Sequence, residues 1–204
     1  MVGCSKKGRA LKYTAFAKAV YFKARPFKLV MYKTQGIIIK RKNLGEYDRL
    51  LTVYTKEFGK ILIKAKSIRK NQSKLRGHLE LFLFTHLMIA PGKGFDIITG
   101  AETIESFPYL HKNLSYLTAI YYLSELIDKL ITNPEQDEEI WKLFYSTFQQ
   151  LNQEDKDIKP IINNFENQLL DFLGYGKQEN FLSFVESMIN DIIKTYPFLI
   201  SNQL

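Results

Sequence analysis

A short segment rich in cations holds the residues best suited to bind a ligand in this sequence. Between Ser67 and Gly77, four basic side chains stand among serine, asparagine and glutamine, with no acidic residue. The four cations are Arg69, Lys70, Lys74 and Arg76. Cations can displace the counterions around phosphate groups, and amides and hydroxyls can orient a phosphate backbone through hydrogen bonds. The segment therefore predicts contact with a nucleic acid.

Further basic residues flank this segment. Residues 60–66 alternate, so Ile61, Ile63 and Ala65 share one face of a strand and leave a wet, basic face opposite. The additional DNA-contact candidates are Lys60, Lys64 and Lys66, with Lys40, Arg41 and Lys42 from an earlier strand. For any single cation, solubilising an exposed surface is the simpler explanation. For the set we favour nucleic-acid binding, because a solvated face usually mixes both signs of charge.

The sequence shows no residue pattern typical of an enzyme. Its histidines are His78, His86 and His111, and we expect His86 to pack in an apolar strand and the other two to be exposed. The single cysteine, Cys4, excludes both a disulfide framework and a multi-cysteine zinc site. The sequence also lacks nucleophile, zinc-protease and paired-carboxylate motifs. We therefore expect no catalytic site, no metal and no cofactor.

Aromatic side chains offer a second way to contact a single strand, because bases stack on them. The candidates are Tyr47, Tyr54, Phe58 and Phe95. We expect Tyr54 and Phe95 to fill a hydrophobic core instead. For Tyr47 and Phe58 both interpretations stay open, because the pattern does not fix the direction in which they face.

Charge is distributed unevenly along the 204 residues. Residues 1–30 contain eight Lys or Arg and no acid, and residues 31–110 contain fourteen basic and seven acidic residues. Residues 111–204 reverse the balance, with seven basic and fourteen acidic residues. A polyanion would be attracted to the first half and repelled by the second.

Short strands separated by turn residues are typical of the sequence from Tyr32 to Phe107. The expected strands are Gln35–Lys42, Tyr47–Tyr54, Lys60–Lys66, Leu79–Ala90 and Phe95–Ser106. Gly59 and the segment Pro91–Gly94 supply turns. Five short strands in this length indicate a small β-barrel or sandwich.

After Pro108 the apolar residues recur with the helical period of about 3.6. We expect helices over Leu114–Ile131 and Glu135–Leu151, a third from Asp157–Pro160 to a cap at Gly174, and a last one from Phe181 to Pro197. Pro134 is expected in the first turn of the second helix, where proline is tolerated. The predicted fold class is α+β, with a barrel followed by a helical bundle.

These patterns divide the chain into three parts. We expect a poorly ordered basic extension over residues 1–30, a barrel domain over residues 31–108 and a helical domain over residues 109–204. The first part could be an arm that contacts DNA phosphates, a targeting sequence, or an upstream extension of a protein that begins at Met31. We favour the extension, since Ser5 is its one serine and transit peptides are rich in serine.

Seven short motifs, in their order and spacing, resemble the amino-terminal domain of the RecO family. They are Gln35–Ile38, Gly45–Leu50, Tyr54–Lys60, Ala65–Lys70, Ser73–Gly77, Ala101–Glu102 and Tyr122–Leu126. The similarity begins close to Met31, which supports the extension, and becomes loose in the later helical part.

The resemblance implies a five-stranded oligonucleotide-binding (OB) fold followed by a helical domain. It implies binding of single- and double-stranded DNA and annealing of complementary strands. It also implies help in loading the recombinase RecA onto DNA coated by single-strand-binding protein, together with the partner RecR, in the RecF pathway of DNA repair and homologous recombination. The family's basic loop corresponds here to Arg69, Lys70, Lys74 and Arg76.

One departure from the family concerns zinc. Many RecO proteins carry a four-cysteine zinc module after a Leu-Gly-Tyr-like segment. Here Leu173–Gly176 is present and no cysteine follows it, so we expect no zinc and a shortened carboxy-terminal region.

A non-enzymatic protein-interaction adaptor is the alternative function, with the barrel binding a protein or peptide. The acidic helical half and the aromatic residues of the last helix leave room for it. No apolar run reaches the roughly 18 residues of a membrane span. We expect a cytoplasmic protein, and the resemblance implies a bacterial one associated with the nucleoid.

Overall fold

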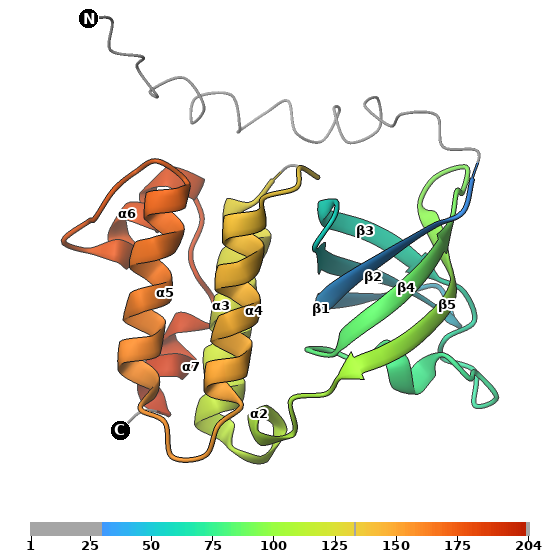
Figure 1. The fold of residues 1–204 in the computed structure, drawn as a ribbon, viewed down its shortest axis with the longest axis horizontal. Helices are drawn as coiled ribbons and strands as arrows, with labels where there is room; N and C mark the ends of the chain where they lie inside the picture. The colour runs from blue at the N-terminus through green and yellow to red at the C-terminus, as the bar shows by residue number, and fades with distance from the viewer. Residues whose placement is uncertain (1–29, 133, 203–204) are drawn as a thin grey trace, which may run out of the picture.

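A computed structural model describes residues 30–132 and 134–202, and in it a β-barrel lies beside a bundle of helices (Figure 1). The strands are β1 (Tyr32–Leu44), β2 (Asp48–Thr55), β3 (Gly59–Ala65), β4 (Phe84–Ala90) and β5 (Asp96–Glu105), with a short 3-10 helix, η2 (Arg76–His78), between β3 and β4. The helices are α2 (Pro108–Lys112), α3 (Leu114–Leu130), α4 (Glu138–Leu151), α5 (Ile158–Phe172), α6 (Phe181–Ile189) and α7 (Tyr196–Ser201).

The strands close into a barrel in the order β1-β2-β3-β5-β4. Neighbouring strands are antiparallel except β3 and β5, which pair in parallel. Strand β1 pairs with two neighbours, so Gly36 stands opposite both Thr55 and Thr85. A Cβ atom on Gly36 would lie 2.7 Å from the Tyr54 carbonyl oxygen, so this crossing requires glycine. The topology is that of an OB fold, which confirms the predicted fold class.

Consecutive residues of β1 are buried in two different cores. Ile38 points into the barrel, whereas Ile37 and Ile39 pack on the outside of the barrel against the helices. The barrel interior contains Ile38, Leu51, Val53, Ile63, Ala65, Ile68, Leu79, Leu87, Ile89 and Ile98. Because Ile63 and Ala65 belong to this interior and Ile61 packs against it, the predicted alternation of β3 is confirmed.

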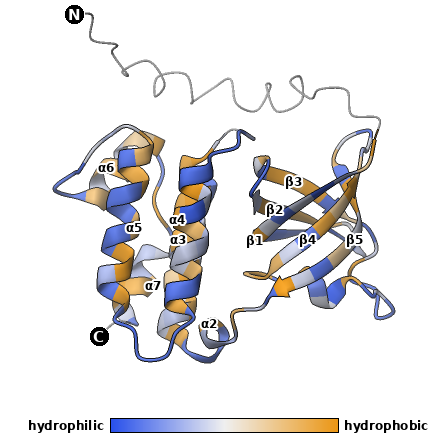
Figure 2. Ribbon diagram, viewed as in Figure 1, coloured by the Kyte–Doolittle hydropathy of each residue, from blue (hydrophilic) through white to orange (hydrophobic). Residues whose placement is uncertain are grey.

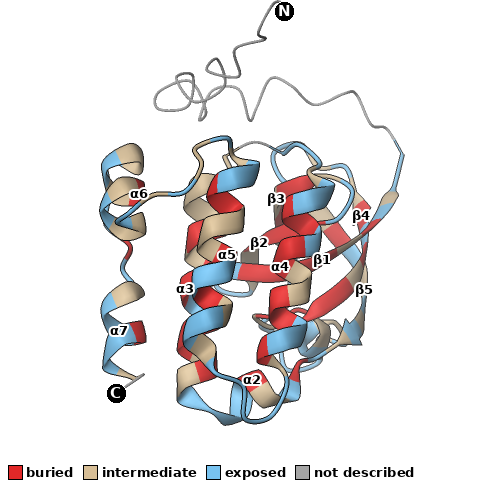
Figure 3. Cartoon of the chain, turned by 60° about the vertical axis from the view of Figure 1, so that its left-hand side comes forward, coloured by how far each residue is buried: buried red, intermediate tan, exposed pale blue. Residues whose placement is uncertain are grey.

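Aromatic side chains join the outside of the barrel to α4. The ring centroid of Trp141 lies 6.1 Å from that of Tyr54 and 5.7 Å from that of Phe84. Nearer the end of the same helix, the ring centroid of Phe148 lies 5.2 Å from that of Phe107, which follows β5. Figure 3 shows buried residues on α4 and on the strands behind it. One hydrophobic core thus continues from the barrel to the helices. It crosses residue 108, where the sequence predicts the boundary between the two domains.

The segment Leu79–Leu83 does not extend β4 as predicted. These residues form bends and turns, and Phe82 has a positive φ of 66°. Leu79 lies in the barrel interior, whereas Phe82 packs among the helices. The ring centroid of Phe82 is 4.7 Å from that of Tyr121. The positive φ of Phe82 is not that of extended backbone, so the chain turns here and β4 begins only at Phe84.

Two helix boundaries also differ from the prediction. Helix α4 begins at Glu138 with Asp137 as its cap, since the Asp137 carboxylate accepts a hydrogen bond from the Ile140 N–H, so Pro134 lies outside the helix. Helix α6 ends at Ile189, and Pro197 stands in the first turn of α7 instead of ending a helix.

The predicted cap at Gly174 is confirmed. Its φ is 84°, and its N–H donates to the Asp171 carbonyl oxygen at 2.9 Å. The Tyr175 N–H donates to the Leu170 carbonyl oxygen at 2.9 Å. These two bonds form a Schellman motif at the end of α5.

Several side chains can be compared with their expected positions. Tyr54 is fully buried, as predicted. Phe95 is 38% exposed instead of lying in the core. His86 is only half-buried, although it lies on the same outer face of β4 as Phe84, which packs against the helices. His111 is exposed as expected, whereas His78 is half-buried. Cys4 and the expected extension lie outside the described residues.

Two buried tyrosines provide a test of the junction core. The Tyr54 hydroxyl is buried without a hydrogen-bond partner, whereas the Tyr122 hydroxyl donates to Glu166 Oε1 at 2.5 Å. Tyr54→Phe keeps the ring and removes an unsatisfied polar group, so we expect unchanged stability or a gain of up to about 2 kcal/mol in urea unfolding. Tyr122→Phe, the matched control, should lose about 1 kcal/mol. Equal losses in both variants would contradict the structure.

Candidate nucleic-acid interface

The basic loop (residues 66–77) and the β1–β2 turn (residues 45–47) form one unit. The Arg69 N–H donates to the Tyr47 carbonyl oxygen at 3.0 Å, and the Arg69 guanidinium donates to the Glu46 carbonyl oxygen at 2.8 Å. Ile68 anchors the loop, because its side chain is buried in the barrel interior. The unit lies on the side of the barrel away from the helices (Figure 1), and Figure 2 shows that the loop is largely hydrophilic.

Asp48, the first residue of β2, also holds the basic loop. Its Oδ1 accepts a hydrogen bond from the Ser67 N–H at 2.8 Å, and its Oδ2 lies 2.7 Å from the Lys64 ammonium. Both partners, Lys64 first, keep the pKa of the Asp48 carboxyl below its ordinary value. Lys64, a predicted DNA contact, is therefore neutralised by a neighbouring strand.

All five cations of the basic loop lack an ion pair with a carboxylate of the described residues. Within the described residues, the following exposed side chains form no ion pair: Lys66, Lys70, Lys74, Arg76 and Arg69. Lys42, at the end of β1, is likewise exposed and unpaired there. Positive charge is thus concentrated on one loop unit whose backbone is fixed by hydrogen bonds, an arrangement suited to phosphate groups.

A cluster of arginines adjoins the basic loop at one end of the barrel. The Glu80 carboxylate accepts hydrogen bonds from both Arg41 and Arg49, the latter at 3.1 Å. Burial lowers the pKa of Arg49, and the positive charges of Arg41, Arg69 and Arg76 add to this effect. One carboxylate therefore faces several guanidinium groups, and the surface keeps an excess of positive charge.

The sequence analysis did not identify Arg49. It lies on the same face of β2 as Leu51 and Val53, whose side chains line the barrel interior, and its side chain is 15% exposed. Arg41 stands opposite Leu51 in β1, so the two arginines are diagonal neighbours across the strand pair. The strand register, once known, would have placed Arg49 beside Arg41.

The structure corrects the predicted position of Lys60. Its side chain faces outward from β3, as expected, but α3 covers that face and leaves Lys60 9% exposed. The Lys60 ammonium donates to the Asp128 main-chain oxygen and lies 3.3 Å from Asp128 Oδ1. The expected wet, basic face is therefore wrong at this position, because the helical bundle occupies it.

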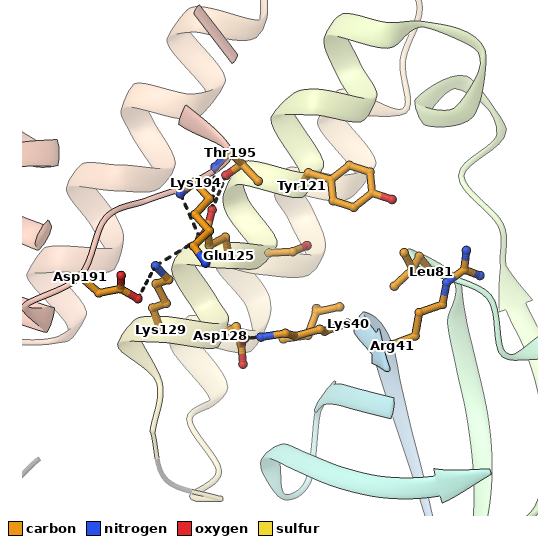
Figure 4. Close-up of a pocket in the computed structure, with 12 residues that line it drawn as sticks. Lys40, Arg41, Leu81, Tyr121, Glu125, Asp128, Lys129, Asp191, Lys194 and Thr195 are labelled. Carbon is orange, nitrogen blue, oxygen red and sulfur yellow. Dashed lines mark hydrogen bonds and ion pairs between the residues drawn. The ribbon is translucent and has the colours of Figure 1, made fainter. Parts of the chain in front are cut away.

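Lys40 belongs to the same ion-pair network. Its ammonium lies 2.6 Å from Asp128 Oδ2 although its side chain is exposed (Figure 4). Burial acts to raise the pKa of Asp128, but the charges of Lys60 and Lys40 outweigh it and hold the pKa below 3.8. The network ties β1 and β3 to α3 and uses two of the cations predicted to contact DNA.

A groove of about 560 Å³ lies beside this network, between β1, α3 and the segment that joins α6 to α7 (Figure 4). Lys129 lies 3.2 Å from Glu125 and 3.0 Å from Asp191, and Glu125 also accepts hydrogen bonds from Thr195. Cations and carboxylates balance one another here. The groove lacks the excess positive charge of the basic loop.

Residues 30–132 and 134–202 contain no cluster suited to a metal ion. No group of three or more His, Cys, Asp or Glu side chains there could hold one. His78, the histidine nearest to the basic loop, accepts a hydrogen bond from the Thr103 N–H at 3.2 Å through Nδ1. No helix in this part of the chain has the length and apolar character to cross a membrane.

Comparison with known proteins supports the resemblance seen in the sequence. A family model described as "Recombination protein O N terminal" matches residues 29–107, and one described as "Recombination protein O C terminal" matches residues 111–180. A protein of Roseiflexus sp. (strain RS-1), named DNA repair protein RecO, is 36% identical over 148 residues, which are 72% of this chain and 52% of that protein.

Two further relatives carry the same name. The protein of Dehalococcoides mccartyi (strain ATCC BAA-2266) is 35% identical over 71% of this chain and 56% of its own length. The protein of Trichodesmium erythraeum is 37% identical over 72% of this chain and 50% of its own length. The chain thus spans about half the length of the curated relatives it matches.

The Asp128 network leads to a test by substitution. Asp128→Asn leaves the Lys60 charge buried without its carboxylate, so we expect a loss of about 3 kcal/mol in the free energy of unfolding. In a Lys60→Met background, the same substitution should cost less than half as much, because the buried cation is gone. Equal costs in both backgrounds in urea unfolding would show that the pair is not coupled.

The same network predicts a pH dependence. The folded pKa of Asp128 lies below the ordinary value of 3.8, so its stabilising effect is complete above pH 3.8 and declines as the pH falls through the folded pKa. The stability difference between the wild type and Asp128→Asn should therefore shrink below that pH. A difference that stays constant in acid would contradict the shift.

Proposed function

Because the chain belongs to the RecO family, we propose that it is a DNA repair protein that binds DNA through the basic loop and the adjoining arginine cluster. The observation that carries the proposal is the concentration of exposed, unpaired cations on one loop unit: Lys66, Arg69, Lys70, Lys74 and Arg76. A DNA strand is a polyanion, and its binding to such a surface gains free energy from counterion release.

The position of the helices supports this assignment. Residues 111–204 carry twice as many acids as bases, and the helices pack on the side of the barrel opposite to the basic loop (Figure 1). A DNA strand would be attracted to the loop end and repelled by the helical bundle. The charge distribution thus orients the nucleic acid on the barrel.

The proposed interface differs from the predicted set of residues. It retains Arg69, Lys70, Lys74 and Arg76, with Lys66, Lys42 and Arg41, and it adds Arg49. It omits Lys40, Lys60 and Lys64, each of which lies beside a carboxylate of Asp128 or Asp48. Arg41 and Arg49 also lie beside a carboxylate, that of Glu80, and are included because their charges adjoin those of Arg69 and Arg76.

The resemblance to the family motivates a finer proposal. We propose that the protein binds single- and double-stranded DNA and anneals complementary strands, since cations that screen the phosphates of one strand reduce its repulsion of a second. We further propose that it works in the bacterial cytoplasm as a non-enzymatic mediator, with RecR, single-strand-binding protein and, indirectly, RecA as partners. The acidic and apolar helical surfaces leave room for those protein contacts.

Charge reversal tests the interface. Replacing Arg69, Lys70, Lys74 and Arg76 by Glu should reduce affinity for a labelled single-stranded oligonucleotide by at least about 100-fold, because several phosphate contacts become repulsive. The slope of log affinity against log salt concentration should become shallower by about one for each phosphate that the variant no longer neutralises. Filter binding and fluorescence anisotropy would measure both.

A matched variant controls for net charge. Lys112, Lys156, Lys159 and Lys177 are exposed on the helical half, and their replacement by Glu changes the total charge by the same amount. This variant should retain at least about one third of the wild-type affinity, since its substitutions lie away from the phosphate contacts. Circular dichroism spectra should show that both variants are folded. Wild-type affinity in a folded loop variant would refute the proposed interface.

A further inference from the structure

We infer that the pocket between the β1–β2 turn and the basic loop receives an unpaired nucleobase, stacked on the ring of Tyr47. The inference rests on the proposed DNA binding and adds to it a preference for single strands. Phosphate contacts by cations alone do not distinguish an unpaired base from a paired one.

The pocket is an open hollow whose volume falls in the range of small-ligand sites. Its volume is about 370 Å³, and its walls are formed by Tyr47, Arg69, Lys70, Asn71 and Gln72. Known small-molecule sites have volumes of about 300–1,000 Å³. An aromatic ring, two cations and two side-chain amides are the groups that bind the face, the phosphate and the edge of a nucleotide.

Tyr47 is exposed yet held in position. Its residue is 44% exposed at the tip of a turn, whereas Tyr54 and Phe84 of the neighbouring strands are buried. Its carbonyl oxygen accepts the Arg69 N–H, and the Arg69 guanidinium donates to the preceding carbonyl, that of Glu46. The backbone of the turn is therefore fixed before a ligand binds, which reduces the entropy lost on binding.

The Lys70 ammonium lies over one face of the Tyr47 ring, and this face is accessible from solvent. Its ammonium lies 5.1 Å from the ring centroid, and both residues are exposed. A base has a larger flat surface than an ammonium group, so it can replace the cation on the ring. The displaced ammonium then lies near the phosphate that belongs to the stacked base.

Asn71 and Gln72 can contact the edge of the base. Both are exposed, and their amides form no hydrogen bond within the part of the chain described. Each amide offers a donor and an acceptor, as the edge of a base does. In a duplex that edge is paired and both faces are stacked, so a paired base would have to leave the helix first.

The test compares Tyr47→Ala with Tyr47→Phe. The alanine variant should bind a single-stranded oligonucleotide about ten-fold or more weakly, because the stacking surface is removed. The phenylalanine variant should bind within about two-fold of the wild type, since every base stacks on either ring. Affinity for a blunt duplex should change less than about two-fold in both variants, because its phosphates contact the unaltered cations.

Tyr109→Ala is the matched control. The Tyr109 ring has a similar cation–π contact, with the Lys112 ammonium 5.3 Å from its centroid, but it lies on α2 away from the basic loop. This variant should bind single strands as the wild type does. A second readout is photo-cross-linking to an oligonucleotide that contains 5-iododeoxyuridine, and mass spectrometry should find the cross-link on Tyr47.

The outcomes separate the two proposals. If Tyr47→Ala binds single strands as tightly as the wild type while charge reversal of the basic loop abolishes binding, the stacking inference is wrong and the DNA-binding proposal stands. If neither variant loses affinity, both are wrong. An equal loss of single-strand and duplex affinity in a folded Tyr47→Ala protein would also overturn the inference, because a structural defect would explain it.

Discussion

The burial of aromatic side chains between the outer face of the barrel and α4 determines which surfaces remain available for binding. Tyr54 and Phe84 from the strands pack against Trp141 of the helix and exclude water from this side of the barrel. Burying aromatic rings of this size contributes a large part of the free energy that holds the two halves together. With this side covered, the β1–β2 turn and the basic loop remain at the uncovered end.

The same packing sorts the cations into two groups. Lys40 and Lys60 lie close to the helices and pair with Asp128. The pairing matters most for Lys60, because its buried ammonium group would be costly without a carboxylate. Lys74 and Arg76 lie on the basic loop and remain in solvent without carboxylates. A cation beside the helices therefore stabilises the fold, whereas a cation on the loop is available to a ligand.

The sequence predicts which face of a strand a side chain lies on better than it predicts which element packs against that face. The alternation of β3, the cap at Gly174 and the barrel implied by the resemblance agree with the structure, because each depends on short-range geometry or on a matched motif. The prediction for Lys60 is wrong because alternation shows that a side chain faces outward but not that a helix from distant sequence packs there. The sequence does contain one sign that the outer face of the barrel is covered. The three consecutive isoleucines of β1 lack alternation, which is typical of a strand buried on both faces.

The start of β2 links the integrity of the barrel to the shape of the candidate interface. Asp48 fixes the basic loop through the Ser67 N–H, and the next residue, Arg49, extends from the inner face of the barrel to Glu80. Ile68 places the loop's apolar anchor in the same interior. The exposed cations thus owe their common position to contacts with buried parts of the barrel. A surface built in this way keeps more cations than carboxylates close together, at the expense of their mutual repulsion, and the phosphates of a bound strand would relieve that repulsion.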